Sequence, residues 1–288
     1  MARLDQVHPA NAAGDWFVDT RCIDCATCRQ LAPGVFVRRS GQSVVGGQPA
    51  DAGAVEVQRA SLACPTQSIG TRIRRPWPRG LFPHELADGV FHLGFNAVDS
   101  FGANAFFAAR AEGNVLVDSP RFTRQLAGPL AELGGVDHVL LTHRDDVADA
   151  ERWASHFGAR TWIHAADADA APFATDVFGG EGPTTVQPGL VAFPVPGHTE
   201  GSAVFVLDER FCFTGDSLHW DADAGDLAAH EHATWYSWSA QAASLAHLAQ
   251  AHRFEWVLPG HGGRGRRPAA EMHTRLVALA DRMARSRP

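Results

Sequence analysis

The sequence contains no lysine, so all 25 of its basic residues are arginine. A Schiff base to a lysine amine and a lysine nucleophile are therefore excluded for this chain. No apolar run approaches the roughly 18 residues that a membrane-spanning helix needs. The first residues, MARLDQVHPANAAGDW, also lack the apolar stretch of a secretion signal. We therefore expect a soluble cytoplasmic protein that does not associate with a membrane.

The sequence also has too little positive charge for one class of partner. Its 25 basic residues stand against 32 acidic ones, which gives a formal net charge of −7 at pH 7. A nucleic-acid-binding domain typically presents a basic face, so we expect no nucleic-acid partner. Hydrophobic residues make up 45% of the 288 residues and charged residues 20%. This balance is usual for a globular protein with a sizeable core.

Cysteine is scarce and unevenly placed. Four of the five cysteines lie before residue 65: Cys22, Cys25, Cys28 and Cys64. An odd number of cysteines without a secretion signal is poor evidence for disulfides, so the clustering indicates a metal or cluster site. The fifth, Cys212, lies in the apolar run RFCFTGD, and we expect it to be a thiol of the core.

The spacing of the four early cysteines favours an iron–sulfur cluster. Cys22, Cys25 and Cys28 follow the pattern C-x2-C-x2-C, and Cys64 returns much later, directly before Pro65. Bacterial ferredoxins place the ligands of a [4Fe–4S] cluster in this way. Zinc sites usually pair two C-x2-C motifs or add histidines. A structural zinc site and a [3Fe–4S] cluster remain as alternatives.

With LAPGVF and ACPTQSI, this segment resembles a single-cluster [4Fe–4S] ferredoxin over roughly residues 15–73. The resemblance implies one cluster held by the four early cysteines. The Arg- and Pro-rich stretch RIRRPWPRGLFP, residues 72–83, is incompatible with a regular helix or a central strand. We therefore predict a ferredoxin-like domain over residues 1–75 and a second domain over residues 76–288, joined by a semi-rigid spacer.

From residue 89 on, short β-rich runs alternate with helical patterns. We expect one helix in DDVADAERWASHFG, capped by Asp145 or Asp146 and ended by Gly158. Four residues with possible chemistry fall at the ends of predicted strands: His143, His198, Asp216 and His261.

These four residues lie in LTHRDD, PVPGHTEGSAVF, FTGDSLHW and VLPGHGG. In order and approximate spacing, the four motifs resemble those of the metallo-β-lactamase superfamily, over roughly residues 88–265. The resemblance implies an α+β chain in which an αββα sandwich, with a metal site between the edges of its two sheets, follows the small domain. It does not settle the activity, because the superfamily also holds thioesterases, lactonases, nucleases, persulfide dioxygenases and flavodiiron proteins.

The first motif departs from the superfamily pattern H-x-H-x-D-H. His143 matches the first histidine and Asp145 stands at the second, but Val147 and Ala148 replace the Asp-His pair. The second metal position would therefore lack most of its ligands. The resemblance implies one remaining ion, held by His143, Asp145, His198 and Asp216. This ligand set suits non-haem iron, manganese or zinc, and we expect one iron or zinc ion.

Two further histidines are candidates for chemistry beside that ion. His261 would be left without a metal, so we expect it to move protons or contact substrate. His219 follows the Gly-Asp motif, as do His230 and His232, and each of the three also fits a surface position. The aromatic stretch ATWYSW, residues 233–238, fits core packing or one wall of a substrate pocket.

A one-electron cluster on the same chain as a metal-binding sandwich favours a redox role. We therefore predict an oxidoreductase whose cluster is reduced by an electron-donating reductase and passes electrons to the metal ion or to a small-molecule substrate. One alternative is a mononuclear hydrolase of a thioester, lactone or similar acyl substrate. Another is a non-enzymatic electron-transfer or binding protein, and a second domain without metal is also possible.

Overall fold

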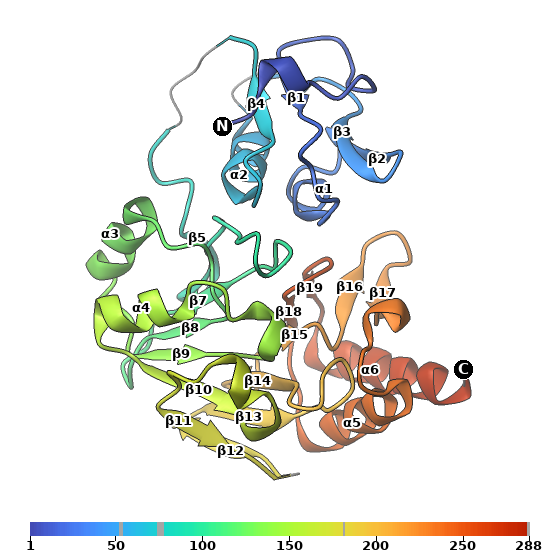
Figure 1. The fold of residues 1–288 in the computed structure, drawn as a ribbon. Helices are drawn as coiled ribbons and strands as arrows, with labels where there is room; N and C mark the ends of the chain where they lie inside the picture. The colour runs from blue at the N-terminus through green and yellow to red at the C-terminus, as the bar shows by residue number, and fades with distance from the viewer. Residues whose placement is uncertain (52–53, 74–77, 181, 287–288) are drawn as a thin grey trace.

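The computed structural model describes residues 1–288 apart from 52–53, 74–77, 181 and 287–288. The chain forms a small N-terminal domain above a larger sandwich (Figure 1). Part of the predicted spacer, residues 72–83, lies outside the described residues. Strand β5 (His84–Ala87) is the first regular element of the sandwich.

The N-terminal domain is built from two antiparallel strand pairs and two helices. Strand β1 pairs with β4, and β2 pairs with β3. Its apolar core, which includes Trp16, Phe36 and Val57, also contains Cys28 and Cys64. Two of the predicted cluster ligands therefore lie in apolar surroundings. The elements in chain order are η1 (Leu4–Gln6), β1 (Trp16–Val18), α1 (Thr27–Leu31), β2 (Phe36–Arg39), β3 (Gln42–Val45), α2 (Val55–Ala63) and β4 (Ile69–Thr71).

The first half of the sandwich is a seven-stranded sheet in the order β11-β10-β9-β8-β7-β6-β5. Strands β8 to β11 run parallel to one another, and α4 lies in the crossover between β9 and β10. Helices α3 and α4 cover the outer face, because Leu126 and Trp153 bury against Leu116 and Val139. The elements are β5, β6 (Val90–His92), β7 (Phe106–Ala108), β8 (Val115–Val117), α3 (Arg124–Glu132), β9 (His138–Leu140), η2 (Arg144–Asp146), α4 (Ala150–Phe157), β10 (Arg160–His164), η3 (Ala165–Ala170) and β11 (Asp176–Phe178).

The second half is a six-stranded sheet in the order β12-β13-β14-β15-β18-β19. Helices α5 and α6 cover its outer face, where Leu245, Leu248 and Leu276 pack against Val257. The elements are β12 (Thr184–Gln187), β13 (Leu190–Pro194), β14 (Ala203–Leu207), β15 (Phe211–Gly215), β16 (His219–Asp221), β17 (Asp226–Ala228), η4 (Glu231–Ala233), α5 (Trp238–Ala251), β18 (Trp256–Pro259), β19 (Gly265–Arg266) and α6 (Ala269–Arg285).

The inner faces of the two sheets pack on each other. Phe106 and Leu140 of the first sheet meet Phe205, Phe213 and Leu258 of the second in one buried cluster. The layers therefore run helices, sheet, sheet, helices, and the predicted αββα sandwich is confirmed. In the described part of the chain, no helix is both long and apolar enough to cross a bilayer.

The segment after β9 differs from the prediction. Neither Asp145 nor Asp146 caps a long helix, because both lie in the short 3-10 turn η2 and α4 begins only at Ala150. Ala148 adopts a left-handed conformation with φ of 36°, which turns the chain before the helix starts. The side chain of Asp149 accepts a hydrogen bond from the loop before α3 instead of capping α4. Asp145 and Asp146 therefore lie at the sheet edge after β9 and not at the start of a long helix.

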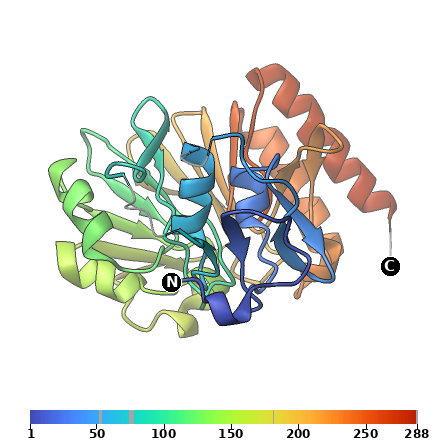
Figure 2. The same cartoon turned by 90° about the horizontal axis from the view of Figure 1, so that it is seen from above.

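The N-terminal domain rests on the sandwich. Ala63, at the end of α2, joins a core cluster with Phe82 and Phe95 of the sandwich. Arg59 donates from Nε to the carbonyl of Leu81 at 3.2 Å. Seen from above, the N-terminal domain lies over the junction between the two halves of the sandwich (Figure 2). Helices α1 and α2 are on the side that faces the sandwich (Figure 1).

Candidate cluster site and metal centre

The four predicted cluster ligands border one small hollow in the N-terminal domain: Cys22, Cys25, Cys28 and Cys64. All are free thiols. Backbone N–H groups point at two of the sulfurs. Those of Asp24 and Ser43 each lie 3.4 Å from Cys22 Sγ, and that of Ser68 lies 3.3 Å from Cys64 Sγ. Donors aimed at sulfur favour the thiolate form, which is the form that ligates iron.

Burial opposes the thiolate form until a cluster binds. It raises the pKa of Cys25 and Cys64, and it raises that of Cys28 to about 12. Without iron these three groups are therefore neutral thiols around a hollow. Four converging sulfurs with N–H donors behind them fit an iron–sulfur cluster, whose binding would release the thiol protons.

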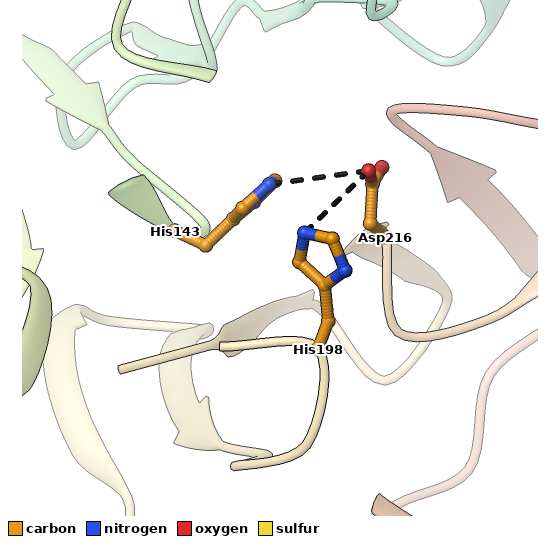
Figure 3. A group of neighbouring side chains, drawn as sticks. All are labelled: His143, His198 and Asp216. Carbon is orange, nitrogen blue, oxygen red and sulfur yellow. Dashed lines mark ion pairs between the residues drawn. The ribbon is translucent and has the colours of Figure 1, made fainter. Parts of the chain in front are cut away.

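Three of the predicted metal ligands meet at the junction of the two sheets. His143 follows β9, His198 follows β13, and Asp216 follows β15 (Figure 3). Their ligand atoms all lie within 4.8 Å of one another. Asp216 Oδ2 is 3.9 Å from His143 Nε2 and 3.8 Å from His198 Nε2. The two imidazole planes are nearly perpendicular, at 86°. Both Nε2 atoms thus face the same carboxylate.

Hydrogen bonds behind the two histidines fix which nitrogen faces the centre. His143 Nδ1 lies 3.0 Å from Thr142 Oγ1, whose own proton goes to Asp118 at 2.9 Å. His198 Nδ1 bonds to the carbonyl of Ala233. Both partners can only accept, so each Nδ1 carries the hydrogen and each Nε2 offers a lone pair. Neither buried Nε2 has a hydrogen-bond partner within the described ranges, and two such lone pairs facing a carboxylate fit a metal ion.

The fourth predicted ligand, Asp145, lies at the rim. Its Oδ2 is 3.3 Å from His198 Nε2, in a direction too poor for a hydrogen bond, and 4.0 Å from His143 Nε2. Its side chain is 49% exposed, and it lies outside the tight group of three. Asp145 therefore remains a predicted ligand, placed on the open side of the centre.

Two further carboxylates, which the sequence analysis did not assign to the centre, are buried beside it. Asp146 is 1% exposed, and its Oδ2 has no hydrogen-bond partner among the residues described. Gly260 makes room for it, because a Cβ there would lie 2.7 Å from Asp146 Oδ2 and 2.8 Å from Asp216 Oδ1. Burial, and then the charge of Asp216, raises the pKa of Asp146 well above its usual range. Burial raises the pKa of Asp118 to about 7.

Asp216 is the carboxylate that stays ionised. Burial alone would raise its pKa, but the neighbouring histidines outweigh it, His261 first and then His143 and His198, and lower the pKa overall. The centre therefore combines one negative charge with two imidazole Nε2 atoms that can ligate a metal once they are unprotonated. Such a combination attracts a cation.

The position of the second metal of the superfamily pattern lacks suitable donors. Val147 packs against the core cluster that contains Trp153, and Ala148 has no donor atom. His261 Nε2 lies 3.2 Å from the carbonyl of Ser100, and its backbone N–H donates to Asp216 Oδ1 at 3.1 Å. His261 is thus bonded to the loop between β6 and β7, a contact that no sequence motif indicates.

His219, the other catalytic candidate, lies behind the centre. It is buried and stacked on His230, with ring centroids 4.0 Å apart. Burial and then the charge of His230 lower the pKa of His219 to about 4. His219 is therefore a neutral imidazole at neutral pH. Its part in proton transfer stays a prediction.

Trp238 of the aromatic stretch packs against the core cluster that contains Leu245, as one of the two expectations held, but Trp235 and Tyr236 do not. Trp235 is 68% exposed and Tyr236 is 53% exposed. The Trp235 ring lies 6.1 Å from that of His198, centroid to centroid. The pair therefore fits the other expectation, an aromatic wall beside the metal centre.

A four-layer αββα sandwich with two histidines and a carboxylate converging at one edge defines a fold that can bind a metal there, here joined to a small domain with four converging cysteines. The chain belongs to the metallo-beta-lactamase superfamily, whose family model matches residues 90–280. The family model described as the 4Fe-4S single cluster domain of ferredoxin I matches residues 18–71. The predicted fusion of these two families is confirmed.

Solved structures similar to this chain share the sandwich. VMB-1 is 17% identical with a TM-score of 0.53, and the match covers 70% of this chain and 96% of that one. DIM-1 metallo-beta-lactamase exposed to ceftazidime is 19% identical (TM-score 0.51; 69% and 95% covered). A metallo beta lactamase from Erythrobacter litoralis is 20% identical (TM-score 0.51; 69% and 95% covered). At these identities the likeness establishes the fold alone. No curated protein sequence matches the chain.

His198 should make metal binding depend on pH. Burial lowers its pKa, but the nearby carboxylates of Asp145 and Asp216 raise it above the ordinary value, whereas burial lowers the pKa of His143 to about 4. Near neutral pH, His198 is therefore the histidine that binds a proton when no metal is bound. We expect affinity to fall as the pH drops through the His198 pKa, with about one proton released per ion. Calorimetric titration in buffers of different ionisation enthalpy measures this release, and binding without it would contradict the assignment.

Proposed function

We propose that this protein is an oxidoreductase. In this proposal a [4Fe–4S] cluster held by the four early cysteines delivers single electrons to a mononuclear, iron-type centre held by His143, Asp145, His198 and Asp216, or to a small-molecule substrate bound there. The observation that supports this proposal is the presence of two candidate sites in one molecule. Three converging side chains could hold one ion in the sandwich, and four cysteines border a hollow in the domain that lies above the sandwich (Figure 1).

The loss of the second metal position supports a redox role over the usual hydrolysis. A hydroxide bridging two ions needs ligands for both ions. Among the described residues, one group of three side chains converges as a metal site, whereas Val147 packs against the core and His261 is bonded to Ser100. Two histidines with one carboxylate leave open positions on an iron ion, which is the arrangement of non-haem iron enzymes.

The chain's own residues would orient and charge the centre. A bound iron ion would supply reversible one-electron chemistry at its open positions. The Nδ1 hydrogen bonds hold His143 and His198 in one tautomer, and Asp216 supplies the charge between them. Asp145 borders the open side, where Trp235 would contact an entering substrate.

Partners and location follow from this chemistry. The cluster needs an external electron donor, so we propose a reductase as a protein partner and a small molecule as substrate. Cysteines that hold a cluster and form no disulfide suit a reducing compartment, and we propose the cytoplasm.

A second candidate is a mononuclear hydrolase of a thioester, lactone or similar acyl compound. The feature that favours it is a stacked pair of imidazoles, His219 buried and His230 half-buried. Burial lowers the pKa of both, so both are unprotonated at neutral pH and offer a lone pair to an attacking water.

Metal analysis of anaerobically purified protein separates the two candidates. The redox proposal predicts one iron beyond those of the cluster, and a change in the spectrum of that iron when the cluster is reduced. One zinc ion outside the cluster, with acyl hydrolysis that is indifferent to reduction, would support the hydrolase and contradict the redox proposal.

A further inference from the structure

We propose that a bridging loop, residues 95–104, together with His261 forms the route by which electrons pass from the cluster site to the metal centre. The loop joins β6 to β7. The inference rests on the proposed function, because it needs a redox-active ion at the centre. In the step, a reduced cluster loses one electron and a ferric ion gains it to become ferrous. No bond forms or breaks, and a low-potential reductant recharges the cluster.

At one end, the bridging loop touches the segment that carries the cysteines. A Cβ on Gly102 would lie 2.9 Å from Cys25 Cβ and 3.0 Å from Cys25 Sγ, and φ is +87° at this residue, so glycine is required here. The Gly102 carbonyl accepts a hydrogen bond from Thr27 Oγ1 at 3.1 Å and another from Asn96 Nδ2 at 2.7 Å. Thr27, Asn96 and Gly102 are all buried, so water is excluded from this contact.

At the other end, the bridging loop touches the metal centre through His261. The Ser100 carbonyl lies 3.2 Å from His261 Nε2, and the ring centroids of Phe101 and His261 are 6.0 Å apart. The backbone N–H of His261 then donates to Asp216 Oδ1 at 3.1 Å. Asn104 fixes the loop by donating its backbone N–H to the carbonyl that precedes His261, at 2.8 Å.

These contacts form a short connected path. It runs from Cys25 to the backbone of residues 100–102, then across one hydrogen bond to His261 and across a second to Asp216. The histidine that the superfamily pattern would give to a second ion is here hydrogen-bonded to the loop of the sandwich that touches the cysteine-bearing domain. The bond between His261 and Ser100 therefore has two consequences in this proposal. It takes His261 away from a second ion, and it links the cluster site to the metal centre.

The test is the rate of internal electron transfer in the holoprotein carrying its cluster and a ferric ion. The cluster is reduced by a flash of photoreductant, and its absorbance recovery and the ferric resonance are followed together. His261→Ala should keep the cluster spectrum and the ion but slow the recovery severalfold, because it removes the hydrogen bond to Ser100. His261→Gln, whose amide can still donate to Ser100, should recover part of the rate. His247→Ala is the control, because His247 is an exposed histidine of α5 outside the path, and it should keep the wild-type rate.

The outcomes separate the two proposals. If the wild-type cluster never passes its electron to the ion, the proposed function fails. If the wild type transfers and His261→Ala transfers equally fast, the function stands and the route is wrong. Loss of the ion in His261→Ala would also overturn the route, because it would make His261 a metal ligand. Equal slowing in His247→Ala would show that the effect does not depend on the bridging loop, and would overturn the route.

Discussion

His143→Ala protein is expected to purify with its brown cluster intact but without the ion of the sandwich domain. Among the residues that the structure describes, His143 supplies one of three side chains whose ligand atoms converge, and its buried Nε2 has no hydrogen-bond partner there. Replacing residues that merely orient a ligand typically costs about 10–100-fold in affinity, so loss of the ligand itself should cost more. Elemental analysis against protein concentration, with the visible spectrum as the measure of cluster content, checks the result.

Two variants make this measurement specific. Thr142→Val removes the acceptor that fixes the His143 tautomer but keeps the side chain's shape, so it should weaken metal binding by about 10–100-fold without abolishing it. His247→Ala removes an exposed histidine of α5 and should change nothing. Full metal content in His143→Ala would contradict the proposed centre, and equal losses in all three variants would indicate unfolding.

Much of the metal centre was predictable because each of its residues ends a local pattern. His143 and Asp216 directly follow apolar runs that had to be buried strands, and His198 closely follows another. Residues after strands that end at the same edge of a sandwich come together once the fold is known. The order of the motifs along the chain was therefore enough to predict both the sandwich fold and the three converging residues.

The role of Asp146 could not be predicted, because it depends on where the chain turns. Asp145 and Asp146 are equivalent as helix caps in the sequence, yet one is half exposed at the rim and the other is fully buried. The left-handed turn at Ala148 and the missing side chain of Gly260 decide this difference, and neither leaves a periodic signal.

Contacts between the two domains were equally hidden. Gly102 meets Cys25, and Ser100 meets His261, across separations in sequence that no motif spans. The exposure of Trp235 was missed for a related reason: large aromatic residues usually bury, and only the tertiary fold shows that this one borders the centre.

Cys64→Ala should produce the second large effect. The protein should lose its cluster, and the N-terminal domain should become less stable. Cys64 is 8% exposed and lies in the core of that domain, where burial raises its pKa. Without the cluster, neutral thiols would surround a hollow, and the free energy of cluster binding would no longer favour the folded domain. Visible absorption, thermal unfolding and limited proteolysis of residues 1–75 measure the loss.

Cys212→Ala is the matched control for this loss. Cys212 is also a fully buried thiol, but it lies on β15 in the sandwich, so its replacement should leave the colour unchanged. The sandwich of Cys64→Ala should keep its own ion, because no ligand of the metal centre lies in the N-terminal domain. Undiminished brown colour in Cys64→Ala would refute the four-cysteine assignment, and a remaining three-iron resonance would show that Cys22, Cys25 and Cys28 suffice to hold a smaller cluster. Loss of both the cluster and the ion would instead show that the sandwich needs the N-terminal domain to keep its edge in place.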